Sequence, residues 1–442
     1  MKKRVLFLSD FTIDNLSNIF ISNDIYNEFE LIEPPSNNFI NSILDIENPI
    51  WTNLYLCKIW CSAESIIPEI NNSLDKSKIT EEYLNDSIDN FSENLKKISK
   101  KVGMLFIASF TYNIINYETD FLSMRDNGLS YLLLKMNLRL VSNLNEIDNI
   151  FILNTDKWIK SIGKKSYNLR SWYRAKIPFS NEVFVEASKE ILSAIRANQN
   201  LNKKLLILDL DNTLWGGVIG EDGIDKIDLG GHSEIGEAFV DFQKSILNYK
   251  HRGVLLAINS KNNESDAFEA IEKHPEMVLK KNDFITHRIN WKNKEENIVS
   301  IVDELNLGLD SVVFIDDSEI ERNRVGNALP EVYVPNFPKS PFELSAFLNS
   351  MNCFDKINLT LEDLKRNEMY ADEKARKLAK NSMKNEGDWI ASLEIKIEAM
   401  SLNKNNLKRC VQLLNKTNQM NLSTRRMIES DFVNWSSNET NN

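Results

Sequence analysis

The sequence has few of the residues that would mark a disordered or membrane-spanning chain. Its 442 residues include only 14 glycines and 10 prolines, and hydrophobic residues make up 42%. No apolar run reaches the roughly 18–20 residues of a membrane span. The net charge of -11 disfavours a nucleic-acid backbone or an anionic membrane as the main partner. We therefore expect a folded chain with no nucleic acid and no membrane among its partners.

Cysteine is also scarce, with four residues in the chain. Cys57 and Cys61 stand four residues apart, but no second ligand pair follows at zinc spacing, so buried or free thiols are expected. The opening MKKRVLFLSDF has basic residues before an apolar run, but Ser9 and Asp10 end that run too early for a secretory signal. This stretch predicts a first β-strand, and we expect a cytoplasmic protein.

The chain does contain a regular alternation of apolar strands and helical segments. VLFLSD, GMLFIAS and NIFILNTD indicate strands before residue 200, and a second strand–helix series runs from Leu205 to about Phe354. This pattern predicts an α/β fold, and the length is too great for one hydrophobic core. We divide the chain into an α/β domain at 1–200, a second α/β domain at 201–355, a helical linker at 356–390 and a final segment at 391–442. SLEIKIEAMS and NNLKRCVQLLNKTNQMN predict a strand and a helix in that final segment.

In the second domain, an apolar strand runs directly into two carboxylates. LLILDLDNTLWGG places Asp209 and Asp211 where the strand gives way to a loop, and burying an unpartnered carboxylate costs several kcal/mol. The glycines of WGGVIGEDG allow the backbone to come close to a ligand. Further polar side chains end later strands or precede a helix: Ser260, Lys292, Lys294, Asp316 and Asp317. Because α/β proteins bind ligands beyond the carboxyl ends of their strands, the set predicts one site.

These side chains are the ones that phosphoryl transfer through an aspartyl-phosphate requires. One carboxylate attacks phosphorus, and a second donates a proton to the leaving oxygen and then activates water. Carboxylates beside a phosphate repel one another, so a hard cation such as Mg²⁺ is needed. A lysine and a hydroxyl hold the equatorial oxygens. Each residue alone is more typical of a helix cap, a turn or a solvated surface, and only the ordered set indicates this chemistry.

DLDNTLWGG, NSK, the downstream lysine and IDDSEIER resemble the four motifs of the haloacid dehalogenase (HAD) superfamily of phosphatases. LDLDNTLWGGVIGEDG, FITHRINWKNKEENI and ELNLGLDSVVFIDDSEIERNRV are closer still to its FkbH-like branch in subfamily IIIC. The resemblance is dense over residues 203–370 and weaker on both sides. It implies a HAD-type Rossmann-like parallel sheet and a Mg²⁺ cofactor.

The resemblance also implies roles for the acidic residues. Asp209 matches the nucleophile, and Asp211 matches the acid/base, whose backbone carbonyl would also face the metal. Of Asp316 and Asp317, at least one would bind Mg²⁺, and the inner-sphere ligand stays open. The metal ligands that the resemblance implies are therefore Asp209, Asp211, Asp316 and Asp317.

The same resemblance assigns the phosphate-binding residues. Thr213 would steady the loop around the phosphate, and Ser260 matches the phosphate-binding hydroxyl. Lys294 matches the motif-three lysine because it stands three residues after Trp291, and Lys292 is its competitor. The intervals between the motifs leave no room for a large cap domain. An uncapped site is open to bulky substrates, such as a group on a carrier protein.

The flanking segments carry weaker resemblances. RVLFLSDFTIDNL and LFIASFTYNIIN resemble the SGNH hydrolases, with Ser9 and Asn113 at matching places, but all four histidines follow residue 200 and such enzymes need a histidine base. We expect a scaffold or carrier-docking domain, with a degenerate esterase as the alternative. Residues 391–442 resemble the start of an acyltransferase (GNAT)-like domain, and its Gly-rich pyrophosphate turn does not follow, so we expect no complete acyltransferase.

Three functions remain open. The FkbH-like resemblance implies dephosphorylation of a phosphoglyceryl substrate, such as 1,3-bisphosphoglycerate, with loading of a glyceryl unit onto an acyl carrier protein. Leu210 separates the aspartates, so no thiol stands beside the nucleophile, and Cys353 near this domain is more typical of packing. The second hypothesis is a stand-alone phosphatase on a phosphorylated small molecule or glycan precursor. The third is a non-catalytic scaffold that only binds Mg²⁺.

Overall fold

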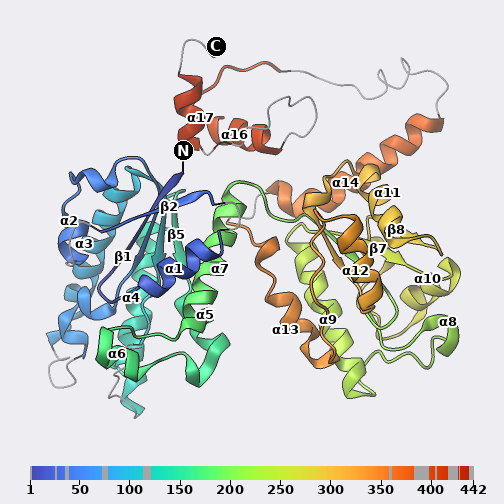
Figure 1. Ribbon diagram of the computed structural model, residues 1–442, viewed down its shortest axis with the longest axis horizontal. Coiled ribbons are helices and arrows are strands. Elements are labelled where there is room, and N and C mark those ends of the chain that lie inside the picture. The colour runs from blue at the N-terminus through green and yellow to red at the C-terminus, as the bar shows by residue number, and fades with distance from the viewer. Residues whose placement is uncertain are drawn as a thin grey trace. The chain divides into compact units, whose positions relative to one another are not determined.

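The computed structural model describes residues 2–24, 27–34, 39–71, 78–112, 121–357, 361–382, 398–403, 406–416, 427 and 429–437. The chain forms two compact units, each built on a parallel sheet (Figure 1). Unit 1 comprises residues 1–192 and 430–442, and unit 2 comprises residues 193–429. Parallel sheets with helices on their faces confirm the predicted α/β class.

Unit 1 contains five parallel strands in the order β2-β1-β3-β4-β5. They are β1 (Lys3–Ser9), β2 (Phe29–Ile32), β3 (Leu54–Trp60), β4 (Val102–Ala108) and β5 (Ile150–Leu153). The middle strands β1, β3 and β4 are buried on both faces, which is why their sequences are continuous apolar runs.

Helices cover both faces of this sheet. One face packs against α2 (Phe39–Leu44), α3 (Glu81–Ser99) and α4 (Leu129–Leu144). On the other face, aromatic contacts join the sheet to α1 (Asp14–Ser22), α5 (Thr155–Ile162) and α7 (Asn181–Asn198). Among its described residues this unit also contains the helices α6 (Leu169–Ala175) and α17 (Glu429–Ser436).

Unit 2 contains four parallel strands in the order β8-β7-β6-β9. They are β6 (Leu205–Leu208), β7 (Leu255–Ser260), β8 (Thr286–Ile289) and β9 (Val312–Ile315). One face packs on α9 (Glu234–His251), α10 (Glu264–Lys273) and α13 (Leu344–Asn349). The opposite face packs on α11 (Lys294–Leu305) and α12 (Glu319–Ala328), and α8 (Ile219–Asp222) is a single turn in the loop after β6.

The helix α14 (Leu361–Ser382) lies in the segment predicted as a helical linker. Its first turns are joined to the rest of unit 2, because Arg366 donates to the carbonyl of Gly253 and also pairs, within the helix, with the buried Asp363. The later helix α16 (Leu407–Lys416) lies within the predicted helix, whereas the predicted strand SLEIKIEAMS falls mostly outside the described residues. Within the described ranges, no helix combines the length and apolar character needed to cross a membrane.

Candidate active site

The predicted site residues come together at the carboxyl end of the unit 2 sheet. Asp209 directly follows β6, Ser260 is the last residue of β7, and Asp316 and Asp317 directly follow β9. Lys294 is the first residue of α11, a short loop after β8. Because β6 lies between β7 and β9, these chain segments converge although they are far apart in sequence.

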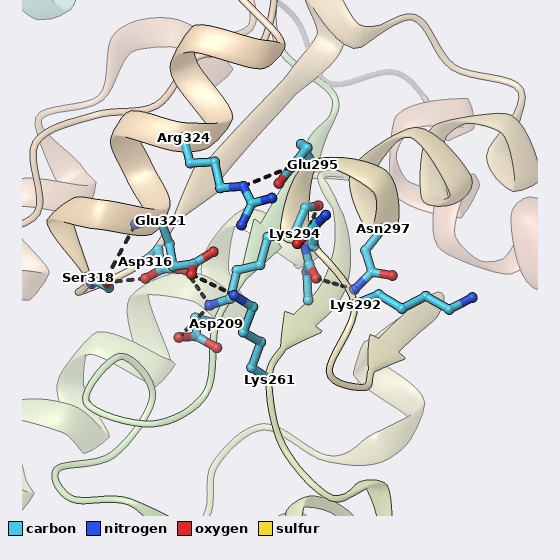
Figure 2. A network of polar contacts seen from close by, with 12 residues as sticks. Asp209, Lys261, Lys292, Lys294, Glu295, Asn297, Asp316, Ser318, Glu321 and Arg324 are labelled. Carbon is cyan, nitrogen blue, oxygen red and sulfur yellow. Dashed lines mark hydrogen bonds and ion pairs between the residues drawn. The ribbon is translucent and has the colours of Figure 1, made fainter.

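A buried lysine joins two of the carboxylates. Lys294 Nζ lies 2.9 Å from Asp209 Oδ2 and 2.5 Å from Asp316 Oδ2, and the exposed fractions of the Lys294 and Asp316 side chains are 3% and 0%. Figure 2 shows Lys294 pointing into this cluster and Lys292 pointing away from it. Of the two lysines that the motif left open, the structure therefore places Lys294 in the site.

The acidic residues fit a divalent cation. Asp209, Asp316 and Asp317 each offer an oxygen, and these oxygens lie within 4.8 Å of one another. Asp209 Oδ1 is buried and has no hydrogen-bond partner among the described residues. Burial, followed by the negative charge of Asp209, raises the pKa of Asp316 to about 7 and also raises the pKa of Asp317. Three carboxylates around one ammonium leave excess negative charge, which Mg²⁺ neutralises through the oxygen ligands it prefers.

Lys294 stays charged in this setting. Burial alone would lower its pKa, but the carboxylates of Asp209 and Asp316 outweigh burial and raise the pKa instead. A buried amide network fixes the start of α11, because Asn259 Nδ2 donates to the carbonyl of Lys294 at 2.9 Å and Asn297 Nδ2 donates to Asn259 Oδ1 at 3.0 Å. The ammonium is thus a permanent charge in a fixed position beside Asp209.

Asp211 is held by a different set of donors. Its Oδ1 accepts from Trp215 Nε1 and from the backbone N–H of Ile219, both at 3.0 Å, and its Oδ2 accepts from Asn262 Nδ2 at 2.9 Å. Its side chain does not belong to the group of carboxylates that could share an ion, so any metal contact is left to its backbone carbonyl. Burial raises the pKa of Asp211, which favours the proton-donating form that a general acid needs.

One glycine of the loop WGGVIGEDG shapes the loop itself, and the close approach to a ligand predicted for these glycines stays a prediction. Gly217 adopts φ +94, and a Cβ there would lie 2.8 Å from Asp222 Oδ2. The same Asp222 oxygen accepts the N–H of Val218 at 2.8 Å. The glycine therefore lets the loop close on its own Asp222, which brings the N–H of Ile219 onto Asp211.

Thr213 ties the two acidic loops together, and Arg322 braces the loop after β9. The hydroxyl of the fully buried Thr213 accepts the N–H of Asp317 at 3.2 Å. Arg322 Nη1 donates to the carbonyls of Asp316 and Asp317 at 2.7 and 2.6 Å. Thr213 therefore links the loop after β6 to the loop after β9, and its role beside the phosphate stays a prediction. Arg322 was not singled out in the sequence.

The sequence did not identify the residues that position the site side chains. These are Trp215, Asn259, Asn262, Asn297 and Arg322. Asn262 stands two residues after Ser260, and Trp215 lies inside the glycine motif, so both fall within the recognised motifs. Their polar type gives no sign of which side chain they bind. Only the meeting of loops from β6 and β7 makes Asn262 a donor to Asp211.

Comparison with solved structures places this site in a known class of enzyme. The chain is similar to the N-terminal part of the protein BF1531 from Bacteroides fragilis, whose structure contains a phosphatase domain complexed with Mg. The two are 30% identical with a TM-score of 0.72, and the match covers 81% of this chain and 95% of that chain. No family model and no curated protein matches the chain.

The fold and the acidic site thus define a phosphatase of the HAD type. The chain belongs to the same family as the phosphatase-domain protein BF1531. The predicted Rossmann-like fold is confirmed by this neighbour, and the predicted Mg²⁺ cofactor is confirmed by the neighbour together with the triad of Asp209, Asp316 and Asp317. Assignment to the FkbH-like branch, the SGNH-like character of the first domain and the carrier protein stay predictions.

Proposed function

We propose that this protein is a Mg²⁺-dependent phosphatase that works through an aspartyl-phosphate on Asp209. The observation that carries this proposal is the state of the Asp209 carboxylate. Lys294 holds its Oδ2, while Oδ1 is buried without a hydrogen-bond partner among the described residues. Because Lys294 orients Oδ2 and no described group bonds to Oδ1, the carboxylate can coordinate a metal ion or attack phosphorus.

The reaction proceeds in two half-reactions. An oxygen of Asp209 attacks phosphorus and forms a P–O bond, while the bond to the leaving oxygen breaks and Asp211 donates its proton to that oxygen. Asp211 then takes a proton from water, which attacks the phosphorus of the aspartyl-phosphate. Phosphate leaves, and the Asp209 carboxylate is restored. The raised pKa of Asp211 supports the proton-donating step, and its three hydrogen-bond donors, which favour the carboxylate, hold the side chain in place for the step in which it takes the proton.

Other residues balance charge and orient the phosphate. Asp209, Asp316 and Asp317 would hold Mg²⁺, which when bound offsets the repulsion between the carboxylates and the phosphate. Lys294 carries a positive charge beside Asp209, where negative charge increases on the transferred group. Ser260, at the end of β7, is the hydroxyl that we assign to a phosphate oxygen.

The test is phosphate release from p-nitrophenyl phosphate and a panel of phosphorylated sugars and acids, with acid-quenched samples analysed for a phosphoenzyme. We expect Asp209→Asn to lose at least ~10³-fold in kcat and to form no phosphoenzyme. Asp241→Asn is the matched control, because its carboxylate lies on an exposed face of α9, where it pairs with the exposed Lys244. Full activity in Asp209→Asn would exclude Asp209 as the nucleophile, and no phosphate release from any substrate by the parent chain would instead support the scaffold hypothesis.

A second proposal concerns the substrate. Residues 205–315 are described throughout, and between the strands they contain only α8 to α11 and short turns, so no separate cap domain covers the strand ends in that range. An open site accepts a group attached to a protein. Burial raises the pKa of the Cys353 thiol to about 12, so this cysteine is a poor acyl acceptor and packing is the role its surroundings favour.

These observations favour an acceptor thiol on a partner, as in the FkbH-like hypothesis. The thiol of an acyl carrier protein would take the glyceryl carbonyl of 1,3-bisphosphoglycerate as a thioester, with phosphate as the leaving group that takes the thiol proton. The remaining phosphoester would be the substrate of Asp209. Intact mass spectrometry of a holo carrier protein, incubated with enzyme, Mg²⁺ and 1,3-bisphosphoglycerate, tests this step. A glyceryl adduct supports carrier loading, and phosphate release without an adduct leaves a stand-alone phosphatase.

A further inference from the structure

Unit 1 has a hollow that the proposed phosphatase chemistry does not use. It encloses about 440 Å³, open solvent at its mouth included. The lining side chains on which the argument depends are Asp10, Phe11, Trp60, Tyr112, Trp172 and Phe179. Asp10 and Phe11 follow β1, Trp60 ends β3, and Tyr112 follows β4, so the hollow lies at the carboxyl end of the unit 1 sheet.

The hollow also lies where the strand order reverses. In the order β2-β1-β3-β4-β5, the chain leaves β1 for β2 on one side and returns to β3 on the other. The connecting loops then diverge, because α1 packs on one face through Phe20 and Phe7 while α3 packs on the opposite face. Such reversals create the crevice in which open α/β sheets bind their ligands.

The floor of the hollow is a fixed aromatic cluster. Trp60 and Phe179 stack with ring centroids 4.9 Å apart, and Phe11 makes edge contacts with both, at 5.5 and 5.8 Å. On the wall, Lys176 Nζ lies 4.8 Å from the centre of the Trp172 ring. That ring therefore already attracts one cation, as the negative potential of an indole face predicts.

A fixed carboxylate completes the hollow. Both oxygens of Asp10 accept the N–H of Ser62, at 3.0 and 3.1 Å, and its Oδ2 also accepts the hydroxyls of Ser62 and Ser65. These partners are neutral, so they orient the carboxylate without cancelling its charge. The pKa of the neighbouring Cys61 is raised by burial and then by the charges of Asp10 and Glu64.

We propose that this hollow binds a small organic cation, an ammonium group carried on a compact apolar or ring-shaped body. The aromatic faces and the Asp10 carboxylate both present negative potential, so an ammonium is attracted by each and an anion is repelled by each. The apolar body replaces water on the half-buried ring of Phe11, which lies against the buried stack of Trp60 and Phe179.

The hollow binds this ligand without hydrolysing it. Ser9 Oγ accepts the N–H of Phe11 at 3.2 Å, and the first 200 residues contain no histidine to serve as its base. Asn113, the other residue singled out by the SGNH resemblance, lies outside the described residues. A binding role for the first domain therefore needs none of the esterase machinery.

The experiment uses the full chain and three probes of equal shape: benzylamine, benzyl alcohol and benzoate. Binding is followed by tryptophan fluorescence and by isothermal titration calorimetry. We expect saturable binding of benzylamine, at least ~10-fold weaker binding of benzyl alcohol and no binding of benzoate. Tetramethylammonium, which donates no hydrogen bond, should bind as well, because the attraction is to charge.

Two variants locate the site. Asp10→Asn keeps the size of the side chain. It should weaken the binding of benzylamine at least ~10-fold and leave the binding of benzyl alcohol unchanged. Asp14→Asn, an exposed aspartate in the first turn of α1, should change nothing. Trp172 is a half-buried residue of α6, and Trp172→Leu should weaken the binding of both cationic probes, benzylamine and tetramethylammonium. This variant provides a second test if Asp10→Asn unfolds. Equal binding of all three ring probes, no saturable binding, or an unchanged Asp10→Asn would overturn the proposal.

Discussion

At the scale of single residues, the candidate active site is organised around the position of one lysine. Lys294 contacts Asp209 and Asp316 in a place that water hardly reaches, whereas Lys292, two residues earlier, is exposed. The attraction between buried charges is strong, and removing one partner leaves the others unpaired. Lys294 therefore holds the nucleophile in place and offsets its charge at the same time.

Replacing Lys294 by Met should lower kcat at least ~100-fold and, without Mg²⁺, lower the free energy of unfolding by about 3 kcal/mol, because two buried carboxylates lose their counter-charge. Lys292→Met is the matched control and should stay within about 0.5 kcal/mol of the parent, as exposed substitutions do. Phosphate release and urea unfolding in EDTA measure the two effects. Equal losses in both variants would contradict the assignment of Lys294.

At the scale of an element, β3 departs from the rule that central parallel strands are apolar. Lys58 lies in the middle of this strand, between Phe7 and Phe106 of the neighbouring strands, and is fully buried. Its Nζ has no hydrogen-bond partner among the described residues and lies 5.0 and 4.8 Å from the ring centres of Trp60 and Trp158. Burial lowers the pKa of Lys58 to about 7, although the charge of Glu190 acts in the opposite direction.

This lowered pKa makes stability depend on pH. Between about pH 7 and pH 10.5 the unfolded chain binds a proton that folded Lys58 has lost, so the free energy of unfolding rises with pH across this window and is lowest below it. Lys58→Met should be more stable than the parent at pH 6.5. Between pH 6.5 and pH 9.5, the free energy of unfolding of the parent should rise by about 3 kcal/mol relative to that of the variant. Urea unfolding at both pH values measures this gain, and the exposed Lys160→Met serves as control. Parallel pH profiles for parent and Lys58→Met would refute the prediction.

At the scale of the whole molecule, the chain has two parallel sheets, each with its own core and its own candidate site at the carboxyl ends of the strands. The carboxylate triad belongs to unit 2, and the aromatic hollow belongs to unit 1. A ligand stabilises the state that binds it by mass action, and this effect is greatest in the segments that surround the ligand. The two ligands should therefore protect different parts of the chain.

Hydrogen exchange of the full chain, after metal removal with EDTA, tests this separation. Mg²⁺ at about 100 times its Kd should stabilise the bound state by roughly 2.7 kcal/mol and slow exchange around β6, β9 and the start of α11. Benzylamine should slow exchange around the ends of β1 and β3 instead. Asp316→Asn should abolish the Mg²⁺ effect and keep the benzylamine effect. Protection of the same segments by both ligands would contradict two separate sites.

Much of the fold could be predicted because the decisive signals are local. The apolar runs at Leu205–Leu208 and Val312–Ile315 form strands buried on both faces, and the acidic residues after them lie at one edge because parallel strands end together. The positioning groups could not be predicted in this way. Asn262 donates to Asp211, 51 residues earlier, and Arg322 donates to the carbonyl of Asp316, 6 residues earlier. The sequence pattern indicates neither of these contacts, although the second one is local.

The sequence by itself determined the α/β class, the carboxylates at the strand ends and the need for a cation, because burying adjacent charges has a large free-energy cost whatever the fold around them. Only the tertiary structure decided that Lys294 and not Lys292 enters the site, that the glycine loop supplies an N–H to Asp211, and that Asp10 faces an aromatic hollow. Each of these depends on which side chains from distant segments meet. That is settled by the packing of strands and helices, which no single stretch of residues contains.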